Sequence, residues 1–156
     1  MKKYFLKLYQ YNAWANKRVL SCLKQQNVSQ EKILSLMGHI AAAEMLWLHR
    51  IKNLPKPDVK LWSNYSLQEI EKMLIKIDPD WISFIETIEQ FDRELSYKNY
   101  TGDQFTNNVE DIMIHTANHA SYHRAQVAML LRQNGFEPVN TDFITYDRVL
   151  RGQLPN

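Results

Sequence analysis

The sequence predicts an all-α protein built as a four-helix bundle, and three observations lead to that prediction. Of 156 residues, only four are glycine and five are proline. These residues cluster between long stretches rich in Leu, Ile, Ala, Glu, Lys and Gln, which favour helix. Within the stretches, apolar residues recur every three or four positions. A hydrophobic content of 45% is enough to bury the core of one domain over residues 1–156.

The first two expected helices are separated by a short polar connection. Apolar residues from Phe5 to Cys22 follow helical spacing and predict a helix over about 3–25. A second helix is expected from about 30 to 53, with Asn27 and Ser29 as candidate N-terminal caps. Because only a few residues join the two, we expect them to be antiparallel neighbours.

A long irregular connection and a third helix come next. Residues 54–65 contain Leu-Pro-Lys-Pro-Asp and, at about 3.3 Å per residue, are long enough for a crossover back along the bundle. Ser66 and Glu69 match a capping box that opens a helix reaching about Phe91. Pro79 is expected to break or kink this helix.

The last third of the chain predicts a hairpin and two more helices. The pattern over 95–106 is typical of a short β-hairpin, which does not change the fold class. One of two asparagines, Asn107 or Asn108, then begins a fourth long helix that ends at the Asn-Gly pair of residues 134–135. A short fifth helix is expected over 141–150.

Charge and cysteine content exclude several classes of function. A net charge of +2 is too small to predict a nucleic-acid partner. Cys22 is the only cysteine, so no internal disulfide forms and nothing indicates an oxidising compartment. No stretch has the length of an uncharged membrane span, and Lys7 interrupts the apolar run that a signal peptide needs. We expect a cytoplasmic protein that binds neither nucleic acid nor membrane.

Three of the five histidines lie on one face of the fourth expected helix. His115, His119 and His123 are four residues apart, and each step of four rotates only about 40° around a helix. Two imidazoles at this spacing can bind one metal ion, but a site of this kind needs at least a third donor. His39 is the best candidate because it lies in an apolar stretch of the second helix, where an uncompensated imidazole is costly.

The expected depths of these histidines agree if the second and fourth helices are antiparallel. His39 lies about 14 Å from the start of its helix, and His119 and His123 lie about 17 to 23 Å from the end of theirs. His49 is expected near a helix end, in a solvated position. A zinc-protease motif is excluded because Ala120 occupies the position of the required glutamate.

Three segments resemble the DinB/YfiT superfamily. They are Tyr-Asn-Ala-Trp-Ala-Asn-Lys-Arg at 11–18, Gly-His-Ile at 38–40 followed by Glu44 and Trp47, and Asn-His-Ala-Ser-Tyr-His-Arg-Ala-Gln at 118–126. The resemblance covers nearly the whole chain. It implies an up-down-down-up four-helix bundle, often dimeric, in which one histidine of the second helix and two of the fourth hold a metal.

Matched residue by residue, the ligands that the resemblance implies are His39, His119 and His123, and the family often has a non-ligand histidine at the position of His115. Relatives include thiol-dependent S-transferases and metal-dependent hydrolases. An open position on a Lewis-acidic ion lowers the pKa of a bound thiol or water. The expected function is therefore activation of a small thiol or water against a small electrophile. The expected metal is zinc or nickel, with iron or manganese as alternatives.

The neighbours of the histidines have expected roles as well. Gln126 shares a face with His123 and is expected to orient a ligand imidazole. Tyr122 and His115, which lie close to the ligands in sequence, are further candidates for contact with a ligand imidazole or the substrate. Arg124 points elsewhere and is expected to pair with an acid on another helix. The alternative to an enzyme is a non-catalytic, metal-stabilised binding or dimerisation protein. A homodimer is expected from the resemblance.

Overall fold

The structure is a computed structural model that describes residues 1–99 and 101–155. It is mainly helical, as predicted, with one small hairpin. No helix within these residues combines the length and apolar character needed to cross a membrane. The elements are α1 (Lys2–Gln25), α2 (Glu31–Ile51), α3 (Leu67–Thr87), β1 (Glu94–Lys98), β2 (Gln104–Asn108), α4 (Val109–Gln133) and α5 (Phe143–Leu150).

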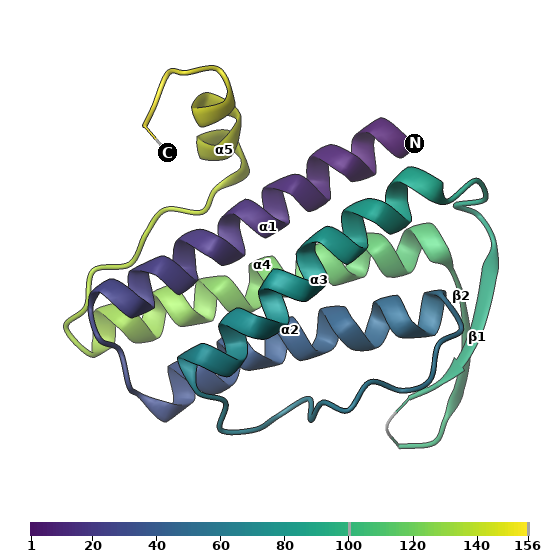
Figure 1. Cartoon of the computed structure of the whole chain (residues 1–156), viewed down its shortest axis with the longest axis horizontal. Coiled ribbons are helices and arrows are strands. Elements are labelled where there is room, and N and C mark those ends of the chain that lie inside the picture. Colours follow the sequence, from purple (N-terminus) through teal and green to yellow (C-terminus); the bar gives the residue numbers. More distant parts are fainter. Residues whose placement is uncertain (100, 156) are drawn as a thin grey trace.

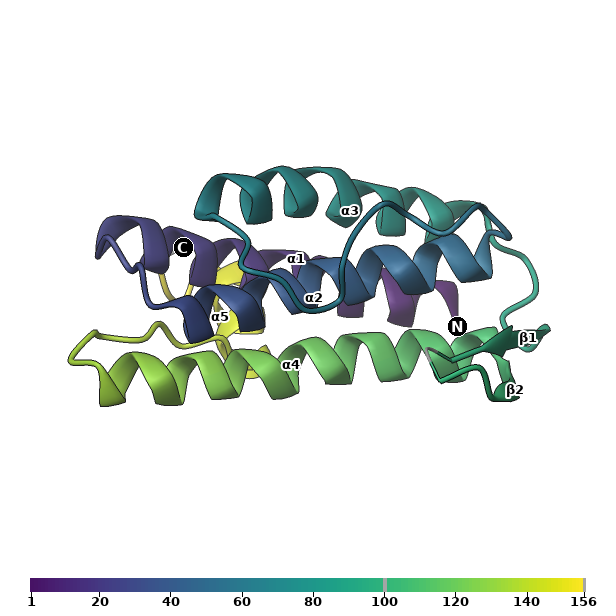
Figure 2. The same cartoon turned by 90° about the horizontal axis from the view of Figure 1, so that it is seen from below.

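The four long helices lie side by side along the length of the molecule. α1 and α4 run in one direction, and α2 and α3 run in the opposite direction (Figure 1). α3 and α4 lie on opposite sides of the other two (Figure 2), and both α1 and α2 pack against both of them. α1 and α2 are antiparallel, as predicted. Their predicted adjacency is wrong, because the connection over 26–30 spans up to about 16 Å and lets α3 and α4 pack between them.

The connection between α2 and α3, residues 52–66, is the crossover loop. Because both helices run the same way, the loop returns along the length of the molecule (Figure 1). Its last part is closed by a two-way hydrogen bond. The Lys60 N–H donates to the Tyr65 hydroxyl at 2.9 Å, and that hydroxyl donates to the Lys60 carbonyl at 2.8 Å. Residues 60–65 therefore form a compact turn against α2.

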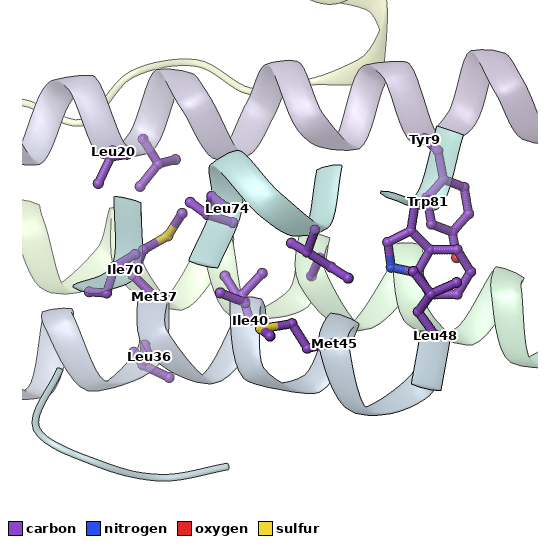
Figure 3. Close-up of a cluster of buried hydrophobic side chains, with 14 of the residues drawn as sticks. Tyr9, Leu20, Leu36, Met37, Ile40, Met45, Leu48, Ile70, Leu74 and Trp81 are labelled. Carbon is purple, nitrogen blue, oxygen red and sulfur yellow. The ribbon is translucent and has the colours of Figure 1, made fainter. Parts of the chain in front are cut away.

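A continuous apolar core joins the helices. Figure 3 shows Trp81 of α3 beside Tyr9 of α1, and the two ring centroids are 4.6 Å apart. A break or a kink was predicted at Pro79. The break is wrong, since α3 continues through this residue, and the kink stays a prediction. Buried residues before and after it, among them Leu74 and Ile85, lie in the same core. Their burial offsets the one helical hydrogen bond that proline cannot make.

Helix termini follow the sequence signals in part. Ser66 begins α3 with the predicted capping box: its hydroxyl accepts from the Glu69 N–H, and Glu69 accepts from the Ser66 N–H at 2.8 Å. The predicted caps of α2 are wrong, because the helix begins after Gln30 with no side-chain cap. α3 ends at Thr87, earlier than predicted, because the chain turns there toward the hairpin. The predicted hairpin is confirmed, with β1 and β2 antiparallel.

Gly38 is expected to be the residue of α2 that tolerates substitution least for steric reasons. A Cβ added there would collide with the Tyr65 ring, whose Cγ would lie at 3.1 Å. Gly38→Ala would gain about 1 kcal/mol in helix propensity, but overpacking costs about 1–3 kcal/mol, and Tyr65 is held by its hydroxyl. We expect a net loss in the free energy of unfolding, measured by urea denaturation. In a Tyr65→Ala background the same change should stabilise, and a loss there of equal size would contradict the clash.

Candidate metal centre

His39, His119 and His123 converge between α2 and α4. One ring nitrogen from each lies within 4.8 Å of the others. The Nε2 atoms of His39 and His123 are each 3.1 Å from Nε2 of His119. His119 and His123 come from successive turns of α4, and His39 comes from the facing part of α2. The packing of these two helices therefore brings together residues 80 positions apart.

Hydrogen bonds on the outer side of two rings fix which nitrogen faces the centre. Nδ1 of His39 lies 2.8 Å from the Leu61 carbonyl oxygen, and Nδ1 of His123 lies 2.7 Å from Oε1 of Gln126. A carbonyl oxygen only accepts, so both Nδ1 atoms carry the proton and donate it. The Nε2 lone pairs of both neutral rings consequently point at His119.

This arrangement fits a bound cation better than three neutral imidazoles alone. If His119 carries its proton on Nε2, that single N–H faces two lone pairs, on Nε2 of His39 and of His123. It can make a good hydrogen bond to only one of them, so the other close nitrogen pair is left without a hydrogen bond. In a tetrahedral site with metal–nitrogen bonds of 2.0–2.1 Å, two ligand nitrogens lie about 3.3 Å apart. The 3.1 Å spacings are close to this value. Three imidazole donors suit a divalent transition metal.

Electrostatics keep the cluster in its metal-binding form. Burial, followed by the neighbouring His123 and His39, lowers the pKa of His119 to about 3. Burial also lowers the pKa of His39, opposed by its hydrogen bond to Leu61. Neutral imidazole is the form that binds metals. Both rings are therefore available as ligands at neutral pH.

The crossover loop covers one side of the cluster. The Trp62 ring stacks on the His39 ring with centroids 3.7 Å apart and planes at 6°, although 56% of Trp62 is exposed. The Leu61 carbonyl that orients His39 comes from the same loop. Neither residue was predicted from the sequence. Helical spacing says nothing about a loop, and the only available signal was an aromatic residue in an irregular segment.

The other residues singled out in the sequence lie around the cluster. His115 is outside the group of three nitrogens: its ring is 5.5 Å from the His119 ring and 5.7 Å from the Trp47 ring. The Tyr122 ring lies 5.2 Å from His123 and is largely exposed. Gln126 contacts His123 directly. His49 is half-buried at a distance from the cluster and donates to the Pro55 carbonyl.

Arg124 differs from its predicted role. It is buried, but its guanidinium donates to Asn12 and Asn16 of α1, not directly to an acid. Those asparagines donate in turn to Glu44. The acid is reached through two amides, since Asn12 and Asn16 of α1 lie between the guanidinium of α4 and the carboxylate of α2.

Comparison with known proteins agrees with the sequence motifs. The model of the DinB family matches residues 1–151. The chain belongs to the DinB family. It is similar to Protein DinB of Bacillus subtilis (strain 168), with 23% identity over 163 aligned residues that cover 94% of this chain and 95% of that protein. The predicted resemblance is thus confirmed. In this DinB family member the match takes in all four long helices and all three clustered histidines.

Replacing Gln126 is expected to weaken metal binding although all three proposed histidine ligands are kept. Gln126→Leu keeps the size of the side chain but removes the oxygen that accepts from His123 Nδ1. The loss of such an orienting partner typically costs 10–100-fold in metal affinity. A chelator competition with Zn²⁺ should show a loss of this order. Gln133→Leu, at the exposed end of the same helix, is the control, and equal affinities for the two variants would contradict the role of Gln126.

Proposed function

We propose that this protein binds one divalent transition-metal ion through His39, His119 and His123 and activates a small thiol or water against a small electrophile. The observation that supports it most strongly is the convergence of three Nε2 atoms, two of them fixed as lone-pair donors. A bound ion with an open position would supply Lewis acidity, which lowers the pKa of a thiol or water. Zinc or nickel is the proposed metal, with iron or manganese as alternatives.

The residues around the cluster favour a site that a small molecule can reach from one side. His119 is half-buried, whereas His39 and His123 are buried. Trp62 covers His39 and also lies 6.0 Å from the His123 ring, so it shields the crossover-loop side from water. We propose that the substrate approaches along the His119 side, where the half-buried Trp47 and the exposed His115 and Tyr122 offer rings for contact.

The proposal extends to architecture, location and assembly. The directions of the four long helices (Figure 1) support the up-down-down-up four-helix bundle that the family resemblance implies. A cytoplasmic location agrees with a thiol substrate, since thiols are kept reduced there. Exposed apolar residues on α4 outside the proposed substrate side, namely Ile114 and Met129, support a homodimer. Sedimentation should give twice the 18.5 kDa chain mass, and a monomer at micromolar concentration would overturn the dimer.

Activity can be tested with two probe reactions on metal-loaded protein purified without a histidine tag. In the first, cysteine, coenzyme A or another small thiol attacks monochlorobimane: a carbon–sulfur bond forms, chloride leaves and the thiol proton passes to solvent. In the second, water hydrolyses p-nitrophenyl acetate to acetate and p-nitrophenol. We expect one of the two to depend on added metal and to be lost in His119→Ala.

The outcomes distinguish the candidate functions. Metal-dependent thiol conjugation supports an S-transferase, and metal-dependent ester cleavage alone supports a hydrolase. If the protein binds one metal ion per chain but shows neither reaction across a wider panel of thiols and electrophiles, the proposal of an enzyme is overturned. That outcome favours the non-catalytic alternative, in which the metal cross-links α2 to α4. That alternative is supported by the position of the cluster between these two helices.

A further inference from the structure

A buried hydrogen-bond network lies next to the histidine cluster. Arg124 is 2% exposed, and its Nη1 donates to Oδ1 of Asn12 and Oδ1 of Asn16, both at 2.7 Å. Its Nη2 donates to the Ser121 hydroxyl at 2.9 Å. One guanidinium therefore joins two successive turns of α1 to α4.

The network continues from α1 to α2. The side-chain amides of Asn12 and Asn16 both donate to Oε1 of Glu44, at 2.8 and 3.2 Å. All three residues are 2% exposed or less. The polar path thus runs from α4 through α1 to α2. Its two ends, α4 and α2, are the helices that carry the clustered histidines, whereas α1 supplies none of them.

The network and the histidine cluster occupy neighbouring positions on the same two helices, α2 and α4. Arg124 directly follows His123, and Ser121 lies between the two clustered histidines of α4, His119 and His123. Glu44 lies five residues, or about one and a half turns, after His39 on α2. A sliding movement of α2 along α4 would therefore break the network and, at the same time, move the Nε2 atoms of the histidines apart.

The network is not optimal for stability. Oε2 of Glu44 and Nε of Arg124 are buried without a hydrogen-bond partner in the described structure. Buried charges that are incompletely partnered often cost more than an apolar replacement would. Buried polar atoms without partners, which lower stability, are expected mainly at residues that have a functional role.

We propose that Arg124, Asn12, Asn16 and Glu44 form a positioning network that fixes α2 against α4 at the separation which three imidazoles need to bind one metal ion. This inference rests on the proposed metal site. Apolar packing alone tolerates small shifts between helices, whereas a metal site needs its ligands within about 0.5 Å of their productive positions. The planar guanidinium, which donates in fixed directions to three oxygens, supplies that constraint.

The test is Co²⁺ binding, followed by visible absorption, in variants that circular dichroism shows to be folded. Arg124→Lys keeps the charge but cannot bond to Asn12, Asn16 and Ser121 together. Asn16→Ala removes one bridge to Glu44. We expect both to bind Co²⁺ about 10–100-fold more weakly than the parent protein, with altered ligand-field bands. Glu44→Gln keeps the Oε1 acceptor and should stay within about threefold of the parent.

A core control separates positioning from general stability. Ile85 is fully buried in α3, which carries none of the clustered histidines, near the end of α3 that follows Trp81. Ile85→Val or Ile85→Ala, whichever matches the stability loss of Arg124→Lys, should keep the parent affinity and spectrum.

Each outcome supports or overturns the inference. Parent-like affinity and bands in both Arg124→Lys and Asn16→Ala, or an equal loss in the Ile85 variant, overturn it. If Arg124→Lys does not fold, Asn16→Ala decides alone. A loss in Glu44→Gln as large as in Arg124→Lys overturns hydrogen-bond geometry as the cause. Failure of the parent protein to bind Co²⁺ overturns the metal site and this inference with it.

Discussion

His119→Ala is expected to remove nearly all divalent metal from the protein. Nε2 of His119 lies 3.1 Å from Nε2 of both partner histidines, so it is the central donor of the three. The remaining two imidazoles make a weak site, and we expect affinity to fall by roughly 100-fold or more. Metal content of untagged protein by mass spectrometry should drop from near one ion per chain to background, and chelator competition gives the size of the loss.

His115→Ala is the matched control for this change. It removes an imidazole one turn away on the same face of α4, but that ring lies outside the three-nitrogen group. We expect His115→Ala to retain the metal content of the parent protein. Equal loss in the two variants would show that the number of histidines on α4, not their convergence with His39, determines binding.

Arg124→Met is expected to destabilise the protein by about 3–5 kcal/mol at pH 7, because it leaves the carboxylate of Glu44 buried without a cation. Burial raises the pKa of Glu44, whereas Asn12, Asn16 and Arg124 lower it. Asp78 of α3 faces the same group: burial and Glu44 raise its pKa to about 8, and Asn16 and Arg124 oppose that rise. Without Arg124 the pKa values of both carboxyl groups should rise further. A raised folded-state pKa means that stability falls as pH rises, so the cost should be larger at pH 8 than at pH 5. Urea unfolding at the two pH values measures it.

Two further variants define the cause of that loss. Arg132→Met removes an exposed arginine from the end of the same helix and should change stability by less than about 0.5 kcal/mol. Adding Glu44→Gln to Arg124→Met should restore part of the loss and reduce its pH dependence. A loss that is the same at both pH values and unaffected by Glu44→Gln would assign the effect to packing alone.

Much of the fold follows from local signals in the sequence. The scarcity of glycine and proline, the helical spacing of apolar residues and the Ser66 capping box predict all four long helices. A helix break at Pro79 and the packing partners of α1 were predicted wrongly for a common reason. Both depend on which elements meet in the core, and tertiary burial outweighs a local preference of one residue or one short connection.

The candidate site could be predicted only where a periodic element carries it. Spacing nominated His115, His119 and His123, and helix depth with the family resemblance replaced His115 with His39. Trp62, the Leu61 carbonyl and the amide bridge to Arg124 were not predicted. The first two belong to the crossover loop, whose path follows no period. The bridge needs two residues of α1 to meet α2 and α4 at one level, which is set by packing.

The most direct test of the central claim is X-ray absorption on the protein loaded with one Zn²⁺ per chain. We predict a first shell that contains three imidazole nitrogens at about 2.0–2.1 Å, with the multiple-scattering pattern of histidine. His39→Ala should reduce the number of imidazoles to two, although this residue lies on a different helix from the other two ligands. A first shell with fewer than three imidazoles in the parent protein, or one unchanged in His39→Ala, would contradict the site.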